Sequence, residues 1–186
     1  MDIPFDVTNV RLETDRLILR AFSESDLDDF YAYASVPGVG EMAGWSHHKS
    51  KDTSKVVLRS FLEGKEVFAL YHKNDGKVIG SLGIHKLKAN DEEEYKDLKI
   101  KSIGYVLSKD YWGQGLMPEA IKAVIEYGFD ILNLDAFICG HFSDNIQSKR
   151  VIEKCGFSFT KRSISHMNQL ERDIETLNYI LLKISR

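Results

Sequence analysis

A pair of glycines in the second half of the chain has the spacing and context that binding chemistry would use. Gly113 and Gly115 are separated by one residue, follow an apolar stretch, and precede Pro118 at an expected helix start. Glycine lets a backbone approach a ligand closely, and proline suits the first position of a helix. The first N–H groups of a helix lack intrahelical partners and attract anions, helped by the helix dipole. The pattern therefore predicts a phosphate site.

The glycine spacing is weak evidence when it is taken alone, because structural turns use the same pair. A dinucleotide-binding fingerprint would need a third glycine, and a Walker-type loop would need a following Gly-Lys-Ser/Thr; the chain has neither. A second group strengthens the interpretation, since Asn145 and Ser148 lie one helical turn apart and share a face. The competing account is that Asn145 caps a helix and Ser148 is an incidental exposed residue.

Together these groups resemble the GNAT family of acetyl-CoA-dependent N-acetyltransferases. Within that family, the likeness is to the branch that acetylates the N-termini of ribosomal proteins. Three stretches carry it in register from about residue 12 onward: 12–20, then 103–105 with 112–117, and finally 145–148 with 153–157. Each motif is moderately specific, and the three in this order are strongly specific.

The resemblance implies a site for acetyl-CoA. The diphosphate would rest on main-chain N–H groups of the glycine loop, and the pantetheine arm would pair with the preceding strand as an added β-strand. The loop residues here are Trp112, Gly113, Gln114, Gly115, Leu116 and Met117. The strand residues are Tyr105, Val106 and Leu107, whose side chains we expect in the core while their backbone serves the cofactor. By the same likeness, Asn145 would hold the pantetheine arm.

The implied reaction also needs groups that move protons. A neutral amine attacks the thioester carbonyl, an oxyanion forms and a thiolate leaves, so the enzyme must orient both substrates and supply an acid and a base. CoA itself carries the activated group, so no covalent enzyme intermediate is required. The resemblance implies that Ser148 donates a proton to the leaving thiolate.

The general base is left open by the sequence. Related acetyltransferases often carry Glu two residues before the position of Gly104, and this chain has Ser102 there. His85, in the neighbouring strand, is the best replacement because imidazole titrates near neutrality. His141 is second, Glu94 is third, and a water chain to bulk solvent is a further alternative.

Gly44-Trp45 lies between the first two expected helices, where this family builds its acceptor pocket. Trp45 could close over an amine or a peptide N-terminus, or it could pack the helix connection; both interpretations stay open. His47 and His48 are adjacent, but no Cys or carboxylate completes a ligand set nearby in the sequence, so we expect no metal.

Composition narrows the class of protein. With 186 residues, 43% of them hydrophobic and 28% charged, the chain is expected to form one domain, residues 1–186, with a real core. A net charge of −3 disfavours a nucleic-acid partner, and no apolar run is long enough to span a bilayer. The N-terminus does not look like a signal peptide, and Cys139 and Cys155 are expected as free thiols. These features favour a cytoplasmic protein.

The hydrophobic pattern predicts the elements that must position these groups. Strands are expected at 16–22, 67–71, 78–87, 102–107, 135–141, 157–167 and 176–184, and helices at 23–36, 52–64, 118–132 and 145–154. The signal for a hairpin at Asn74-Asp75-Gly76 is strong, residues 89–99 are expected as a solvated loop, and Glu171-Arg172-Asp173 as a solvated turn. A strand–helix–strand unit should cross right-handed with parallel strands.

These elements predict an α/β fold: a single mixed, mostly antiparallel sheet of about six to seven strands with helices on both faces. Three functions remain open. The first is acetylation of a protein or peptide α-amine, the second is acetylation of a small amine such as a polyamine, an amino acid or an antibiotic, and the third is an inactive acetyl-CoA-binding regulatory module. The closing hairpin could also extend the sheet across a homodimer.

Overall fold

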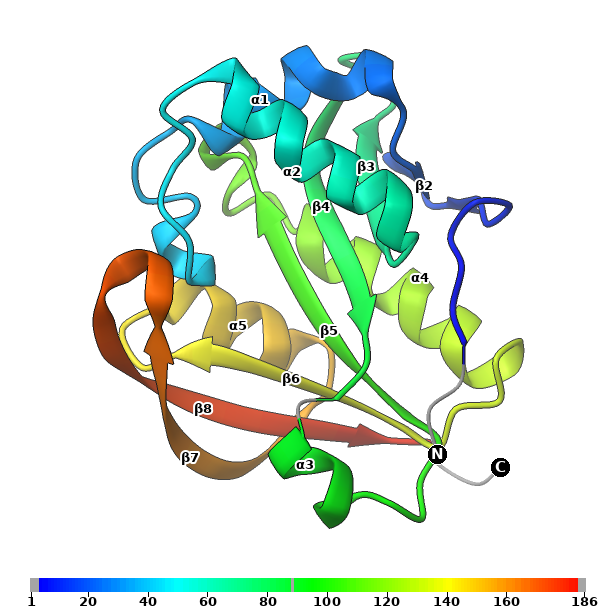
Figure 1. Ribbon diagram of the computed structural model, residues 1–186. Helices are drawn as coiled ribbons and strands as arrows, with labels where there is room; N and C mark the ends of the chain where they lie inside the picture. The colour runs from blue at the N-terminus through cyan, green and yellow to red at the C-terminus, as the bar shows by residue number, and fades with distance from the viewer. Residues whose placement is uncertain (1–3, 88, 184–186) are drawn as a thin grey trace.

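One sheet of eight strands runs through the molecule and carries helices on both faces (Figure 1). The computed structural model describes residues 4–87 and 89–183. The strand order is β1-β2-β3-β4-β5-β6-β8-β7. The bounds are β1 Leu12–Glu13, β2 Leu17–Ala21, β3 Val67–His72, β4 Lys77–His85, β5 Ile100–Leu107, β6 Ala136–Phe142, β7 Ser158–Met167 and β8 Arg172–Leu182. The predicted mixed sheet is confirmed, although the expected strand count was too low because β1 has only two residues.

Five α-helices lie within the described residues: α1 Leu27–Ala34, α2 Lys51–Gly64, α3 Ala89–Glu94, α4 Leu116–Asp130 and α5 Ile146–Lys154. Short 3₁₀ turns separate several elements: η1 Glu24–Asp26, η2 Glu41–Ala43, η3 Lys109–Tyr111 and η4 Asn168–Leu170. No described helix is both long enough and apolar enough to cross a membrane.

Each face of the sheet has its own apolar core. On one face, α1 and α2 bury Phe30 and Leu58 against Ala69 of β3. On the other face, α4 buries Ile121 and Val124 against the sheet. Successive side chains of a strand point to opposite faces of the sheet, so neighbouring residues of β3 contribute to different cores. Both cysteines are buried and free, as predicted.

Tertiary contacts change three of the expected boundaries. Residues 89–94, expected within a loop, form α3, because Asp91 and Glu94 stand on one face of it and both bind Lys161 of β7. Helix α4 begins at Leu116, two residues before Pro118, because Gly115 takes the N-cap position. Strand β8 begins at Arg172, so the turn expected at 171–173 is confined to Glu171, whose φ is 50°.

The divergence of β5 and β6 is the feature that positions the site. The two strands are parallel, as predicted, and their pairing runs only from Ile100–Ala136 to Ile103–Cys139. Beyond that point β5 continues to pair with β4, and β6 continues to pair with β8. The two facing strand edges therefore separate beyond Ile103 and Cys139 (Figure 1).

Candidate active site

A cavity of about 800 Å³ lies where β5 and β6 separate. Its wall includes the glycine loop at Gly113 and Gly115, the start of α5 at Asn145 and Ser148, and residues of β7 such as Ser163. The cavity thus joins the proposed phosphate loop to the opposite face of the sheet. A volume of this size suits a bound small molecule or cofactor.

The glycine loop has the backbone geometry that only glycine adopts easily. Gly113 and Gly115 have φ angles of +76° and +78°, in the left-handed region that other residues enter at a cost. A methyl group on Gly113 would meet no atom within 4 Å, so conformation, not space, requires glycine there. The left-handed Gly115 sets the start of α4, whose first N–H groups lack helical partners. Pro118 falls in that first turn, where its missing N–H costs nothing.

An ion pair from the other end of the chain supports this loop. Arg16 donates from Nε to Glu119 Oε2 at 2.8 Å, and its Nη2 lies 2.7 Å from the same oxygen. Its Nη1 donates to the carbonyl of Gln114 at 3.0 Å. Glu119 also accepts from the backbone N–H of Arg16 at 2.9 Å and from the hydroxyl of Thr14. Burial raises the pKa of Glu119, but these hydrogen bonds outweigh it and leave the pKa lowered. Arg16 thus pairs with a carboxylate beside the glycine loop.

The other predicted loop residues divide between the cavity and the core. Trp112 lines the cavity and donates from its indole nitrogen to the carbonyl of Leu107 at 2.8 Å, which ties the loop to β5. Leu116 and Met117 line the cavity and are buried in the core beneath α4. The Gln114 side chain turns back to donate to the carbonyl of Asp110 at 3.0 Å.

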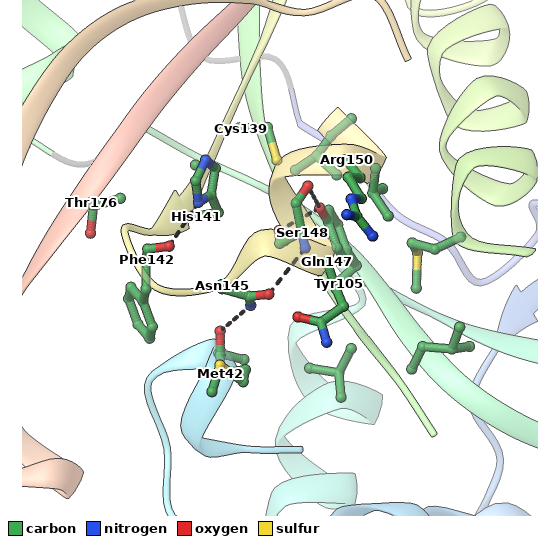
Figure 2. A pocket seen from close by; sticks show the side chains of 18 of the residues that line it. Met42, Tyr105, Cys139, His141, Phe142, Asn145, Gln147, Ser148, Arg150 and Thr176 are labelled. Atoms are coloured by element: carbon green, nitrogen blue, oxygen red, sulfur yellow. Dashed lines mark hydrogen bonds between the residues drawn. The ribbon is translucent and has the colours of Figure 1, made fainter. Parts of the chain in front are cut away.

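Tyr105, Val106 and Leu107 of β5 also line the cavity. Leu107 and Val106 pack in the two cores, as expected for their side chains. Tyr105 also packs against the core, as expected, and in addition its hydroxyl lies 2.7 Å from Ser148 Oγ and donates to the Ser148 carbonyl at 3.3 Å (Figure 2). Burial raises the pKa of Tyr105 well above its usual value, so this phenol stays neutral.

Asn145 and Ser148 stand at the start of α5, inside the same cavity (Figure 2). Asn145 caps the helix, since its Oδ1 accepts from the backbone N–H of Ser148 at 3.0 Å. Its Nδ2 donates to the carbonyl of Met42 at 3.2 Å, which links α5 to the η2 turn. The capping account of Asn145 is therefore confirmed, and its predicted contact with pantetheine stays a prediction. Ser148 is held with its hydroxyl next to that of Tyr105.

The candidates for the general base lie in different places. His141 lines the cavity; its Nδ1 lies 2.7 Å from the carbonyl of Phe142 and its Nε2 lies 3.1 Å from the Tyr179 hydroxyl. The carbonyl can only accept, so Nδ1 carries the proton and the imidazole is neutral when Nε2 accepts from Tyr179. His85 is outside the cavity wall, with Nδ1 3.3 Å from Glu66 Oε2 and its ring next to Gly104. Glu94 binds Lys161 and is also outside the wall.

Trp45 is not brought to the cavity. Its indole packs over Gly40, and its ring centroid lies 5.0 Å from that of His48, in the core under α1 and α2. Met42 and Ala43 of the neighbouring η2 turn line the cavity instead. Among the residues at 4–87 and 89–183, no group of three or more His, Cys, Asp or Glu side chains is arranged to hold a metal ion.

Two features of the cavity were missed by sequence reasoning. Asp91 of α3 and Lys161 of β7 both line it and bind each other at 2.9 Å. The acidic run at Asp91 was visible in the sequence, but its periodicity indicated only a solvated segment. The hydrogen bond between Tyr105 and Ser148 had no sequence signal either, because it depends on the distance between β5 and α5 in the folded protein.

Comparison with known proteins identifies the family. The profile of the acetyltransferase (GNAT) domain matches residues 16–158. The chain is 28% identical over 183 residues to the uncharacterized N-acetyltransferase YoaA of Bacillus subtilis, covering 92% of this chain and 96% of that protein.

Two solved structures show how widely acceptors vary on this fold. The ribosomal-protein-S5-alanine acetyltransferase of Vibrio fischeri superposes with a TM-score of 0.67 at 19% identity, covering 94% of this chain and 97% of the other. The spermidine N-acetyltransferase of Vibrio cholerae, in complex with CoA and spermine, gives 0.71 at 16%, covering 91% and 96%. At these identities the likeness establishes the fold alone. Together with the matched domain and the curated relative, it makes this chain a member of the GNAT family and an N-acetyltransferase.

Proposed function

We propose that this N-acetyltransferase transfers the acetyl group of acetyl-CoA to the α-amine of a protein or peptide N-terminus, by direct attack in a ternary complex. The observation that carries the proposal is the cavity itself, which connects the glycine loop with a second wall of neutral polar groups. Ser163 and Ser165 of β7 and Thr176 and Asn178 of β8 form that wall. Donor and acceptor can therefore meet within one continuous space.

The donor end fits acetyl-CoA. The loop offers main-chain N–H groups at a helix start, Arg16 neutralises the nearby Glu119, and Arg150 and Lys154 bring positive charge to the cavity wall. The strand edge of β5 beyond Ile103 offers backbone groups that an amide-bearing arm can pair with. CoA, when bound, supplies the activated thioester.

The reaction places two demands on the chain's own residues. Ser148 donates its hydroxyl hydrogen toward the leaving sulfur, and Tyr105 orients that hydroxyl through the bond at 2.7 Å. A backbone N–H of β5 is available to the thioester oxygen as negative charge develops there. His85 and solvent reached through the cavity remain the candidates for the amine's proton, with His141 as the buried alternative.

The acceptor end favours a single amine over a polyamine. Asp91 is the only acidic side chain among the described residues of the cavity wall, and it is already paired with Lys161. A polyamine carries several positive charges and would call for several carboxylates along its path. A peptide N-terminus carries one charge and then a neutral backbone, for which serine, threonine and asparagine side chains are suitable partners.

The test is release of CoA thiol on mixing the enzyme with acetyl-CoA and matched amine panels. Peptides with free N-termini should support release, the same peptides with blocked N-termini should not, and spermidine should be a much poorer acceptor. Mass spectrometry should place the added acetyl group on the α-amine. Faster turnover of polyamines or antibiotic amines would favour the small-molecule alternative, and binding of acetyl-CoA without release across the panel would favour a regulatory module.

A further inference from the structure

Helix α3 and strand β7 are joined by a cluster of three charged residues at the acceptor side of the cavity. Lys161 donates from Nζ to Asp91 Oδ1 at 2.9 Å, and it also binds Glu94. These two carboxylates raise the pKa of Lys161 and keep it protonated. The three side chains are partly exposed, at 38% for Lys161, 20% for Asp91 and 43% for Glu94.

Of the described acidic residues on α3, Asp91 is the one that lines the cavity. Lys161 lines it too, whereas Glu94 does not. The carboxylate nearest to the acceptor space is therefore masked by a lysine, and that lysine has a second carboxylate behind it.

Strand register shows which face of the sheet carries Lys161, the partner of Asp91. Lys161 pairs with Asn178 of β8, Asn178 pairs with Gly140 of β6, and Ser102 of β5 pairs with Ile138, two residues before Gly140. Residues directly opposite, and those two apart, share a face of a sheet. Lys161 and Ser102 therefore lie on the same face of the sheet, and both line the cavity together with Asp91. Ser102 is the position at which related acetyltransferases often carry Glu.

We propose that Asp91 is the residue that receives the ammonium group of the acceptor, in exchange for Lys161. Asp91 gives the cavity wall a carboxylate, whereas β5 has Ser102 at the position where related acetyltransferases often carry Glu. The exchange costs little because ion pairs between partly exposed groups are weak. The Lys161 side chain is 38% exposed, so water can solvate its ammonium group when Asp91 turns to the acceptor. A single carboxylate selects an acceptor with a single ammonium at this end, which deepens the proposed function and rests on it.

The experiment compares Asp91→Asn with Glu94→Gln. Each substitution removes one carboxylate from Lys161, but only the first changes the cavity wall, so Glu94→Gln is the matched structural control. Asp91→Asn should raise the KM for a peptide α-amine about tenfold or more and leave the KM for acetyl-CoA within about twofold. Glu94→Gln should change both values by less than about twofold, and Lys161→Gln, which unmasks Asp91, should lower the KM for the peptide by about two- to fivefold.

Equal effects of Asp91→Asn and Glu94→Gln, or an unchanged amine KM in Asp91→Asn, would overturn the proposal. Binding of acetyl-CoA, measured by calorimetry on each variant, identifies a general loss of folding. The same comparison can be run with whichever amine the wild-type enzyme acetylates. Failure of every peptide as an acceptor therefore contradicts the proposed function, while the variant comparison separately decides the role of Asp91.

Discussion

The hydroxyls of Tyr105 and Ser148 can be hydrogen-bonded in two ways, depending on which of them donates to the other. When Tyr105 donates to Ser148 Oγ, the serine hydrogen is free to point into the cavity. When the serine donates to Tyr105 instead, the phenol hydrogen can pass to the Ser148 carbonyl, 3.3 Å away. Only the first arrangement offers a donor to a leaving sulfur. Because burial raises the pKa of Tyr105 well above its usual value, the phenol can orient the serine but is a poor terminal acid.

Substitutions at this pair should act on turnover. Ser148→Ala should lower kcat about tenfold to a hundredfold with the KM for acetyl-CoA nearly unchanged, because the lost hydrogen bond forms as the sulfur becomes negative. Tyr105→Phe should cause a smaller loss, and the double variant should be no slower than Ser148→Ala. Steady-state kinetics on the three variants measure this. Additive losses would show that Tyr105 acts independently of Ser148, and an unchanged kcat in Ser148→Ala would remove Ser148 from the mechanism.

At the scale of elements, the proposed phosphate loop is held by a contact with the N-terminal part of the matched domain. Arg16, just before β2, reaches the Gln114 carbonyl and the Glu119 carboxylate at the start of α4. Glu119 is favourable for the helix start, but its charge would repel a diphosphate. Arg16 pairs with Glu119 and so reduces that repulsion at the proposed phosphate loop.

Removal of Arg16 should therefore weaken donor binding. Arg16→Ala should raise the KM for acetyl-CoA about tenfold while kcat at saturation stays close to the wild-type value, because a carboxylate is left uncompensated beside the loop. Adding Glu119→Gln should restore part of the loss. Arg11→Ala is a suitable control, because its ion pair with Glu13 is exposed. An Arg16→Ala variant with an unchanged KM for acetyl-CoA would contradict this role.

At the scale of the whole molecule, the η2 turn ties stability to pH. Glu41 accepts hydrogen bonds from the backbone N–H groups of Gly38 and His47, and its Oε1 lies 2.7 Å from His47 Nδ1. Burial raises the pKa of Glu41, but these bonds outweigh burial and lower it from 4.5 to about 2. The carboxylate is thus a weaker base in the folded chain than in the unfolded chain.

A lowered folded pKa gives the sign of the effect. Glu41 should contribute stability at pH values above 4.5, and this contribution should be lost as pH falls toward about 2. The partly exposed site limits it to about 1 kcal/mol. In urea unfolding followed across this pH range, Glu41→Gln should lose less stability than the wild type. Parallel pH profiles for the two proteins would show that the Glu41 contacts add nothing to folding.

The fold and part of the site could be predicted because their signals are local. Asn74-Asp75-Gly76 specifies the β3–β4 hairpin, and the sequence from Tyr105 to Pro118 specifies a strand, a glycine turn and a helix. The structure gathers Gly113, Gly115 and Ser148 on one cavity wall. The local conformation of each of these segments is set mainly by its own sequence.

The remaining parts depend on contacts between segments that are distant in sequence. The polar and acidic sequence of helix α3 indicated a loop. The helix is held by Lys161 of β7, a contact that its own sequence could not reveal. The sequence left open whether Trp45 contacts the acceptor or packs the helix connection, and its packing against Gly40 and His48 places it in the core. Asp91 lines the cavity because the fold brings α3 and β7 together, and the hydrophobic pattern of the sequence does not predict this contact.

The gap beyond Ile103 and Cys139 has a consequence for which donors the enzyme can use. An unpaired strand edge can form backbone hydrogen bonds with any ligand whose amide groups match its spacing, whatever group the ligand carries at its other end. A truncated thioester, acetylated pantetheine without its nucleotide, should thus remain a usable donor: its KM should rise at least about tenfold, while its limiting rate should stay comparable. Thiol release from this fragment measures how far the sheet alone positions the thioester. If the fragment gives no thiol release, the nucleotide is needed to position the thioester.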